Sequence, residues 1–142
     1  MYICVDFDGT IVDHRYPDTG PPAPGAIEWL REWQKNGAKI ILFTMRSDSQ
    51  QEGAVLKLAV QFLKGYGIEL YGINENPDQY SWTKSPKAYA HIYVDDAAIG
   101  CPLTKPNGFV RPCVNWEIIG PRINQALLDY RDSLIYEPYV NA

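Results

Sequence analysis

The 142-residue chain is predicted to form a single α/β domain over residues 1–142, with a mainly parallel, doubly wound sheet in three layers. Short apolar runs alternate with amphipathic helical patterns, and these runs are nearly continuous, as in strands buried on both faces. Acidic or hydroxyl residues stand where several runs end. Because parallel strands need crossover connections, we expect helices on both faces of the sheet.

The first half of the chain supplies two strands and one helix. Residues 2–7 form the first apolar strand, and residues 13–24, DHRYPDTGPPAP, form an irregular loop with four prolines. A helix is predicted from Ala26 because one face repeats at helical spacing and Gly37 supplies a stop. That face consists of Ala26, Trp29, Leu30 and Trp33. Residues 38–44, AKIILFT, form the second strand.

The second half continues the alternation. Ser49 and Glu52 have the spacing of a helix-capping box, and an apolar stripe then runs to Gly65 through Val55, Leu58, Ala59 and Phe62. Residues 68–73 form a short third strand, residues 74–86 a polar loop, and residues 90–96 a fourth strand. A fifth short strand is expected around residues 109–114. A final helix starts at Pro121, with its stripe at Ile123, Leu127, Tyr130 and Leu134.

Composition argues against several functional classes. The formal net charge is −4 and the 13 Lys and Arg are spread thinly, which argues against a nucleic-acid-binding surface. No apolar stretch approaches the ~20 residues of a membrane-spanning helix, and the residues MYICVDFDGT do not resemble a signal peptide. Cys4, Cys101 and Cys113 have no metal-ligand spacing and are interpreted as reduced. We expect a cytoplasmic protein without membrane contact.

Polar side chains gather at the carboxyl ends of the predicted strands, where ligands bind in such sheets. They are Asp6, Asp8, Thr44, Asn74, Asp95 and Asp96. Singly, each Asp can be explained as a turn or cap residue. Four carboxylates from two strands, however, repel one another unless a cation offsets their charge, and an all-oxygen ligand set suits Mg²⁺ better than zinc.

With a metal in place, these residues can transfer a phosphoryl group. Asp6 can attack phosphorus to give an aspartyl-phosphate. Asp8 comes two residues after Asp6 and therefore lies on the same side of the strand. It can protonate the leaving alcohol and then activate water. Thr44 offers a hydroxyl and nearby backbone N–H groups to the phosphate, and Arg46 can pair with the phosphate or with the rest of the substrate.

The segments DFDGT, ILFTMR and IYVDD, in that order, resemble the haloacid dehalogenase superfamily, most of whose members are Mg²⁺-dependent phosphatases. The resemblance covers the motif positions from Asp6 to Asp96. It implies a Rossmann-like core in which Asp6 is the nucleophile, Asp8 the general acid/base and Thr44 the phosphate-binding residue. It also implies a metal held by Asp6, the Asp8 carbonyl and Asp95, with Asp96 just outside these direct ligands.

The family also uses a lysine to steady the nucleophile and the phosphate. Lys87 matches this role if Ser85 and Pro86 start a helical turn near the site, and Lys84 is the second candidate. At least one of the two lysines is then a solvated loop residue. The expected substrate-binding residues are Gly9, Thr44, Met45, Arg46 and Lys84, and Lys87 is expected to be catalytic.

The intervals between the motifs each already contain a helix and leave no room for a cap domain. The resemblance therefore implies a capless member, which acts on large substrates or borrows a neighbouring subunit of a homo-oligomer. The loop of residues 13–24, with His14, Arg15 and Tyr16, matches the family's short flap, which selects the leaving group; the alternative is that His14 and Arg15 are merely solvated. Tyr80 and Trp82 are expected to border the site, whereas Trp29 and Trp33 belong to the core or to a subunit interface.

The leading hypothesis is a Mg²⁺-dependent phosphomonoester hydrolase that acts through phospho-Asp6 on a small metabolite, such as a nucleotide or a sugar phosphate. One alternative is a phospho-Asp signalling receiver, but a receiver carries its phosphorylated Asp after the third strand, where this chain has Asn74. A second alternative is a non-catalytic binding module on the same fold.

Overall fold

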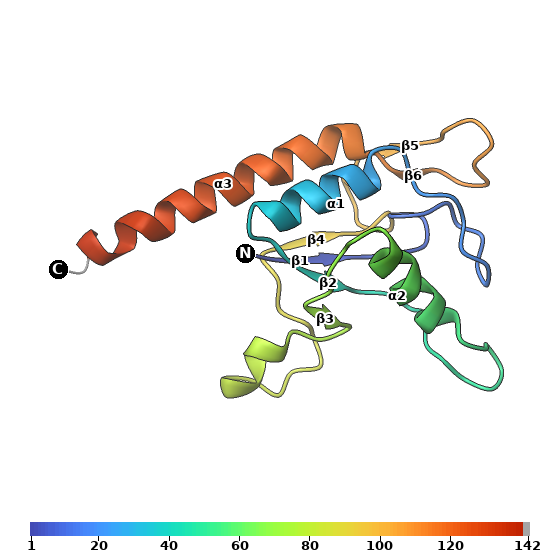
Figure 1. Cartoon of the computed structure of the whole chain (residues 1–142), viewed down its shortest axis with the longest axis horizontal. Coiled ribbons are helices and arrows are strands. Elements are labelled where there is room, and N and C mark those ends of the chain that lie inside the picture. Colours follow the sequence, from blue (N-terminus) through green and yellow to red (C-terminus); the bar gives the residue numbers. More distant parts are fainter. Residues whose placement is uncertain (141–142) are drawn as a thin grey trace.

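The computed structural model describes the backbone of residues 1–140 and the side chains of residues 1–133, so the predicted stripe residue Leu134 and the terminal residues 141–142 lie outside the description. A parallel four-stranded sheet has the order β3-β2-β1-β4. Its strands are β1 (Tyr2–Val5), β2 (Lys39–Leu42), β3 (Gly72–Ile73) and β4 (Ile92–Val94). The helices are α1 (Ala26–Lys35), α2 (Val55–Gly65), the 3₁₀ helix η1 (Pro77–Ser81) and α3 (Trp116–Val140). The predicted α/β class and parallel sheet are confirmed (Figure 1).

The order in which the chain visits the strands determines what covers each face. The chain moves outward from β1 to β2 and β3, so right-handed crossovers place α1 and α2 on one face. The return from β3 to β4 must then cross the other face. Packing agrees, because Ile3 and Val5 pack in one cluster with residues of α1, α2 and α3, whereas Cys4 packs on the opposite side with Ala88 and Ala90.

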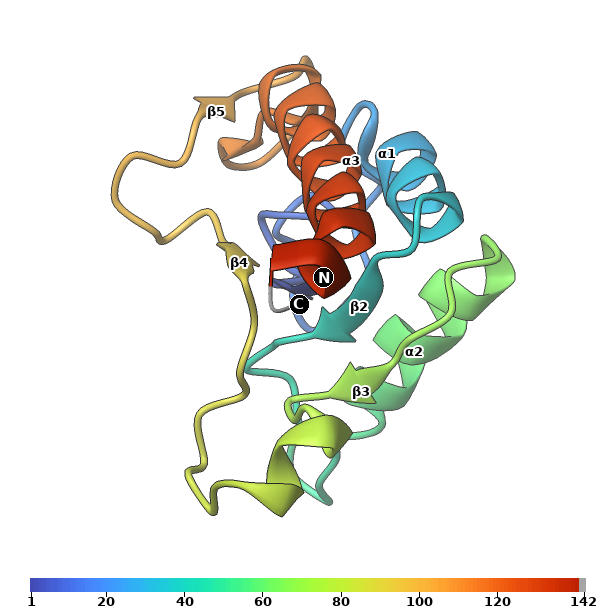
Figure 2. The ribbon, with the colours of Figure 1, turned by 90° about the vertical axis from the view of Figure 1, so that its left-hand side faces the viewer.

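The second face differs from the prediction. It carries η1 and the irregular segment of residues 82–91 in place of an α-helix, as Figure 2 shows. The reason lies in the sequence of this crossover, which has Pro77 and Pro86 and no apolar stripe at helical spacing. Prolines interrupt the backbone hydrogen bonds that a longer helix would need, so only a single short 3₁₀ helix forms within the described part of this connection.

Two of the predicted helix starts are wrong. The Ser49 hydroxyl does accept the Glu52 N–H, at 2.9 Å, but this contact closes a turn before the helix. α2 begins at Val55, where Asp48 Oδ1 accepts the N–H groups of the next two residues at 2.8 and 3.2 Å. Within α2, Leu58 is 49% exposed and Leu63 is buried in its place. α3 starts at Trp116, before Pro121, because Trp116 and Ile119 extend the buried stripe toward the N-terminus.

The contact between α1 and α3 accounts for the positions of the tryptophans. Trp33 is fully buried, and its indole N–H donates to the Gly120 carbonyl of α3 at 3.0 Å. A Cβ atom on Gly120 would lie 2.3 Å from the Trp29 ring, so this helix position requires glycine. At the start of α3, the Trp116 indole donates to the Thr10 carbonyl at 2.8 Å and thereby ties the helix to the loop after β1. The prediction of a core position for Trp33 is confirmed.

The remaining elements complete the fold around the sheet. The expected fifth strand is β6 (Cys113–Val114), which pairs antiparallel with β5 (Leu103–Thr104) in a separate two-stranded sheet. All three cysteines are free. Among the described residues, no helix is both long and apolar enough to cross a membrane.

Candidate active site

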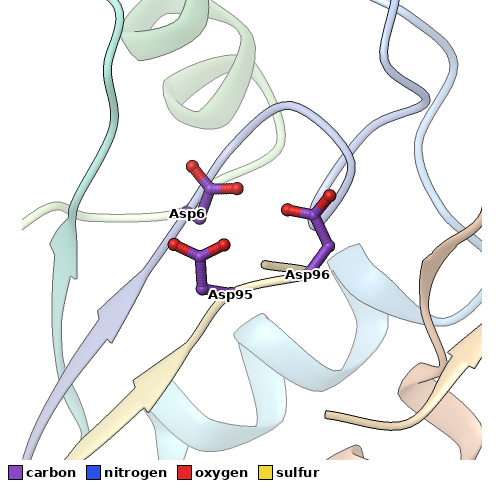
Figure 3. Close-up of side chains that lie close together, drawn as sticks. All are labelled: Asp6, Asp95 and Asp96. Carbon is purple, nitrogen blue, oxygen red and sulfur yellow. The ribbon is translucent and has the colours of Figure 1, made fainter. Parts of the chain in front are cut away.

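Three aspartates meet at the carboxyl ends of β1 and β4. These strands are neighbours, and the strand order reverses between them, which is where α/β sheets bind ligands. The Asp6 N–H donates to the Val94 carbonyl at 2.9 Å, which holds the two strand ends together. Carboxylate oxygens of Asp6, Asp95 and Asp96 all lie within 4.8 Å of one another, and Figure 3 shows the three side chains facing a common space.

Gly9 and Thr10 allow this close approach. Gly9 has a φ of +81°, and a Cβ atom there would lie 2.5 Å from Asp96 Oδ2, so both the turn and the position of Asp96 require glycine. The buried Thr10 hydroxyl lies 3.0 Å from Asp6 Oδ2 and 3.3 Å from Asp96 Oδ1, and it accepts the Asp96 N–H at 3.2 Å. Thr10 therefore links the two acidic strand ends.

The electrostatics of the cluster disfavour three bare carboxylates. Burial, followed by the neighbouring Asp95 charge, raises the pKa of Asp6 to about 8. Burial is also the main cause that raises the pKa of Asp95. A divalent cation would favour the ionised forms, and three carboxylate oxygens at this spacing are a donor set that hard cations prefer. Asp6, Asp95 and Asp96 can therefore hold a metal of the Mg²⁺ type.

Asp8 lies beside this cluster but faces a different partner. Its two carboxylate oxygens accept from Arg46 Nε and Nη2, both at 2.7 Å, in a bidentate ion pair. The Arg46 side chain is 1% exposed and the Asp8 side chain 13% exposed. Arg46 was expected to bind the phosphate or the rest of the substrate, whereas the structure brings it to Asp8.

Thr44 stands across the site at the end of β2. Its N–H donates to the Asn74 side chain at 2.7 Å, and its hydroxyl oxygen accepts the Arg46 N–H at 3.1 Å. Asn74, at the end of β3, adopts a left-handed backbone with φ 55°, a conformation that Asn tolerates. The predicted strand-end residues Thr44 and Asn74 therefore interact, and the hydroxyl proton of Thr44 has no acceptor among the described residues.

One cavity of about 530 Å³ lies at these strand ends. Of the predicted site residues, Asp6, Asp8, Thr44, Met45, Arg46, Asp95 and Asp96 line it. Sequence reasoning had also pointed to His14, in the loop of residues 13–24, and this side chain lines the cavity as well. Met45, which is almost fully exposed, stands at its rim.

Other predicted residues lie elsewhere. Among the described residues no lysine lines this cavity: Lys84 borders a separate hollow beside η1, and Lys87 Nζ lies 5.5 Å from the centre of the Tyr93 ring. Residues 82–91 pack on the sheet face through Ala88 and Ala90, and neither lysine reaches the cavity from there. Tyr80 lines the hollow that Lys84 borders, and Trp82 packs on Tyr89 instead of bordering the cavity. Gly9 does not line the cavity either, and its N–H and carbonyl bond to Val12 and Val114.

Sequence reasoning missed several residues at the site. Thr10 belongs to the quoted DFDGT motif, so its position was visible although its link to Asp96 was not. Glu52 and Arg111 line the cavity without having been predicted, whereas Tyr16 lines it as a residue of the predicted flap. Arg111 comes from the loop between β5 and β6, and no local signal in the sequence connects that loop with the strand ends.

Asp13 fixes that loop beside residues 13–24. Its buried carboxylate accepts the N–H groups of Val110 and Arg111 and pairs with Arg15 Nε at 3.0 Å. Burial disfavours the charge of Asp13, but the hydrogen bonds from Val110, Arg15 and Arg111 outweigh it and lower its pKa. Arg15 also donates to the Gly108 carbonyl, so it ties the two loops together, a role beyond the two that the sequence suggested.

The fold and the site define an α/β protein with a carboxylate-lined cavity at the switch point of a parallel sheet. No protein-family model matches the chain, and no curated protein matches it. Among solved structures, the chain is similar to a conserved protein coded by a locus of Bacteroides thetaiotaomicron, with 33% identity over 89% of this chain and 91% of that one and a TM-score of 0.69. At this identity and coverage the chain belongs to the same family as that bacterial protein.

Proposed function

We propose that the protein is a Mg²⁺-dependent phosphomonoester hydrolase with a capless, three-layer core of the haloacid dehalogenase type. The observation that carries this proposal is the convergence of Asp6, Asp95 and Asp96, with Asp8 and Thr44 lining the same cavity. The residues come from the segments DFDGT, ILFTMR and IYVDD, whose order resembles that superfamily. We further propose that the protein works in the cytoplasm.

The acidic cluster would hold the metal. Asp6, Asp95 and Asp96 offer only oxygen ligands, which favours Mg²⁺ over softer metals. When bound, the cation would neutralise charge on the phosphoryl oxygens and on the attacking carboxylate. Thr10 supports the ligands because its hydroxyl contacts both Asp6 and Asp96.

The first half of the proposed reaction transfers the phosphoryl group to the protein. An Asp6 carboxylate oxygen attacks phosphorus, a P–O bond forms to Asp6, and the P–O bond to the leaving alcohol breaks. Asp8 gives a proton to the departing oxygen, so the alcohol leaves neutral and Asp8 becomes a carboxylate. Thr44 directs its free hydroxyl proton to a phosphoryl oxygen.

The second half regenerates the protein. Asp8 takes a proton from water, whose oxygen attacks the phosphorus of phospho-Asp6, and the bond between phosphorus and Asp6 breaks. Inorganic phosphate is released, Asp6 is again a carboxylate and Asp8 is again protonated. One residue forms the covalent bond while its neighbour carries the proton in both directions.

The cavity favours a small anionic substrate. Its volume of about 530 Å³ suits a phosphorylated metabolite such as a nucleotide or a sugar phosphate. Because Arg46 is already paired with Asp8, the described residues that remain to attract an anion are Arg111 and His14. Both line the same cavity as Asp6 and Asp8, so they could contact the leaving group, and a second subunit could complete the open side.

The test is a screen of the purified protein with Mg²⁺ against a panel of phosphorylated metabolites, with phosphate release as the readout. We expect turnover of at least one phosphomonoester, loss of turnover in EDTA, and recovery on adding Mg²⁺. Acid quenching during turnover should trap acid-stable, hydroxylamine-sensitive phosphoprotein, as expected of an acyl phosphate. Inactivity on the whole panel, or turnover that EDTA does not change, would reject the proposal.

A further inference from the structure

Arg46 is enclosed on every side by groups of this chain. Its guanidinium lies close to two aromatic rings, with Cζ 5.0 Å from the centre of the Phe7 ring and 5.4 Å from that of the Tyr16 ring. Phe7 stands between Asp6 and Asp8 in sequence, and Tyr16 belongs to the loop of residues 13–24. The two rings leave the guanidinium edge as its only polar surface.

Every N–H group on that edge has an acceptor. Nε and one N–H of Nη2 bond to Asp8, and the second N–H of Nη2 bonds to the Asp18 carbonyl at 2.8 Å. Nη1 donates to the Val55 carbonyl at 2.9 Å and lies 3.5 Å from the Pro17 carbonyl. A guanidinium has five N–H donors, so none is left for a substrate.

We infer that Arg46 is a positioning residue, which holds the carboxyl group of Asp8 in the geometry for proton transfer to and from the leaving oxygen. The inference rests on the proposed function of Asp8 as the general acid/base. Through the carbonyls of Pro17 and Asp18, Arg46 also links Asp8 to the loop that borders the leaving-group side of the cavity.

The bidentate geometry of the Arg46–Asp8 pair suits Arg46 to the positioning of Asp8. A bidentate contact fixes both the distance and the plane of a carboxyl group, which a single lysine contact cannot do. Each carboxylate oxygen has two lone pairs, and Arg46 occupies one on each, so the others remain available to exchange a proton. Misplacing a reacting group by about 1 Å can cost on the order of 10²-fold in rate.

The test compares two substrates in one variant, Arg46→Lys. A phosphate ester with a poorly acidic alkyl leaving group needs the proton from Asp8, whereas an activated aryl phosphate such as p-nitrophenyl phosphate needs it much less. We expect kcat/KM to fall about 10²-fold or more for the alkyl ester and less than about 10-fold for the aryl ester. The ratio of the two values cancels the folded fraction of the sample, so partial unfolding of the variant cannot imitate this result.

Arg31→Lys is the matched control. Arg31 on α1 also donates from Nε to a carbonyl, that of Tyr66, at 2.7 Å, and its Cζ lies 6.0 Å from the centre of the Tyr66 ring. Arg31 is exposed and does not line the cavity. Its replacement should leave both substrates unchanged. A double-mutant cycle with Asp8→Asn adds a second test, because Arg46→Lys should cause little further loss once Asp8 can no longer exchange a proton.

A readout without turnover is the NMR signal of the Arg46 Nε–H group, which we expect to move in Asp8→Asn and to stay in place in Arg31→Lys. Equal losses on both esters, or additive losses in the double-mutant cycle, would overturn the positioning role while leaving the phosphatase intact. A wild-type protein that hydrolyses neither ester nor any member of the metabolite panel would overturn the proposed function and this inference together.

Discussion

An aspartate lies near each end of β1, Asp78 at the amino end and Asp6 at the carboxyl end, and the two have opposite surroundings. At the amino end, Asp78 accepts from the Tyr2 hydroxyl at 2.6 Å, the Tyr71 hydroxyl at 2.5 Å and Lys39 Nζ at 3.4 Å. The hydrogen bonds from Tyr2 and Tyr71 lower the pKa of Asp78. At the carboxyl end, Asp6 has two acidic neighbours and no cationic side chain among the described residues of its cluster, and its pKa is raised.

The difference separates a structural acid from a candidate binding acid. Asp78 has donors and a cation within its own chain, so its charge is already satisfied. Asp6, Asp95 and Asp96 repel one another, and the fold keeps them together through Thr10 and Gly9 without supplying a counter-charge. A bound cation would offset this repulsion, which supports the proposed metal site.

Removing the carboxylate at the carboxyl end should have the largest effect. Asp6→Asn keeps the size of the side chain but removes the proposed nucleophile, so the proposed phosphatase activity should fall by about 10⁴-fold or more. The measurement is steady-state phosphate release with saturating Mg²⁺, together with the phosphoprotein trap. A variant that keeps full activity would show that Asp6 does not form the covalent intermediate.

The second prediction concerns stability against pH in the absence of divalent cations. Burial and the Asp95 charge raise the pKa of Asp6 from 3.8 to about 8, so between these values the folded chain binds a proton that the unfolded chain has lost. Stability therefore falls as pH rises through this window. Between pH 5.5 and 8 in EDTA, we expect a loss of roughly 2–3 kcal/mol that Asp6→Asn does not show, and recovery on adding Mg²⁺.

Thermal or urea unfolding at the two pH values measures this difference. The variant serves as the control because groups with other shifts are common to both proteins. His91 is one of them: burial lowers its pKa, so its contribution to stability changes in the opposite direction with pH. If the stability of the wild type and of Asp6→Asn changed equally with pH, the raised pKa of Asp6 would not be the source of the pH dependence.

The sequence predicted the carboxyl end of the sheet better than the connections around it. Asp6, Thr44 and Asp95 follow apolar runs directly, and parallel strands of similar length bring their ends to one edge, so position along the chain was enough. The path of residues 74–91 was not predictable in this way, because irregular segments with prolines have no period. Lys84 and Lys87 were therefore assigned to a cavity that neither of them lines.

Contacts between particular side chains could not be predicted from the sequence either. Arg46 was expected to face the substrate because it follows Thr44. In the structure, however, Arg46 Nε and Nη2 both donate to the carboxylate of Asp8, which follows the neighbouring strand. Arg111 reaches the cavity because Asp13 binds the backbone of its loop, a contact between residues almost 100 positions apart. Such long-range contacts depend on the assembled fold and leave no periodic pattern in the chain.

The smallest effect is expected at the amino end, in Asp78→Asn. The amide keeps an acceptor oxygen but loses its charge, so Lys39 loses its ion pair and the melting temperature should fall slightly. Activity and the response to Mg²⁺ should not change. The hydrogen bond to Asp78 is also the main cause that raises the pKa of Tyr2 to about 12, so absorbance titration should show this hydroxyl ionising at lower pH in the variant. If Asp78→Asn altered turnover or metal response, the two ends of β1 would be coupled, and the distinction between a satisfied acid and a binding acid would fail.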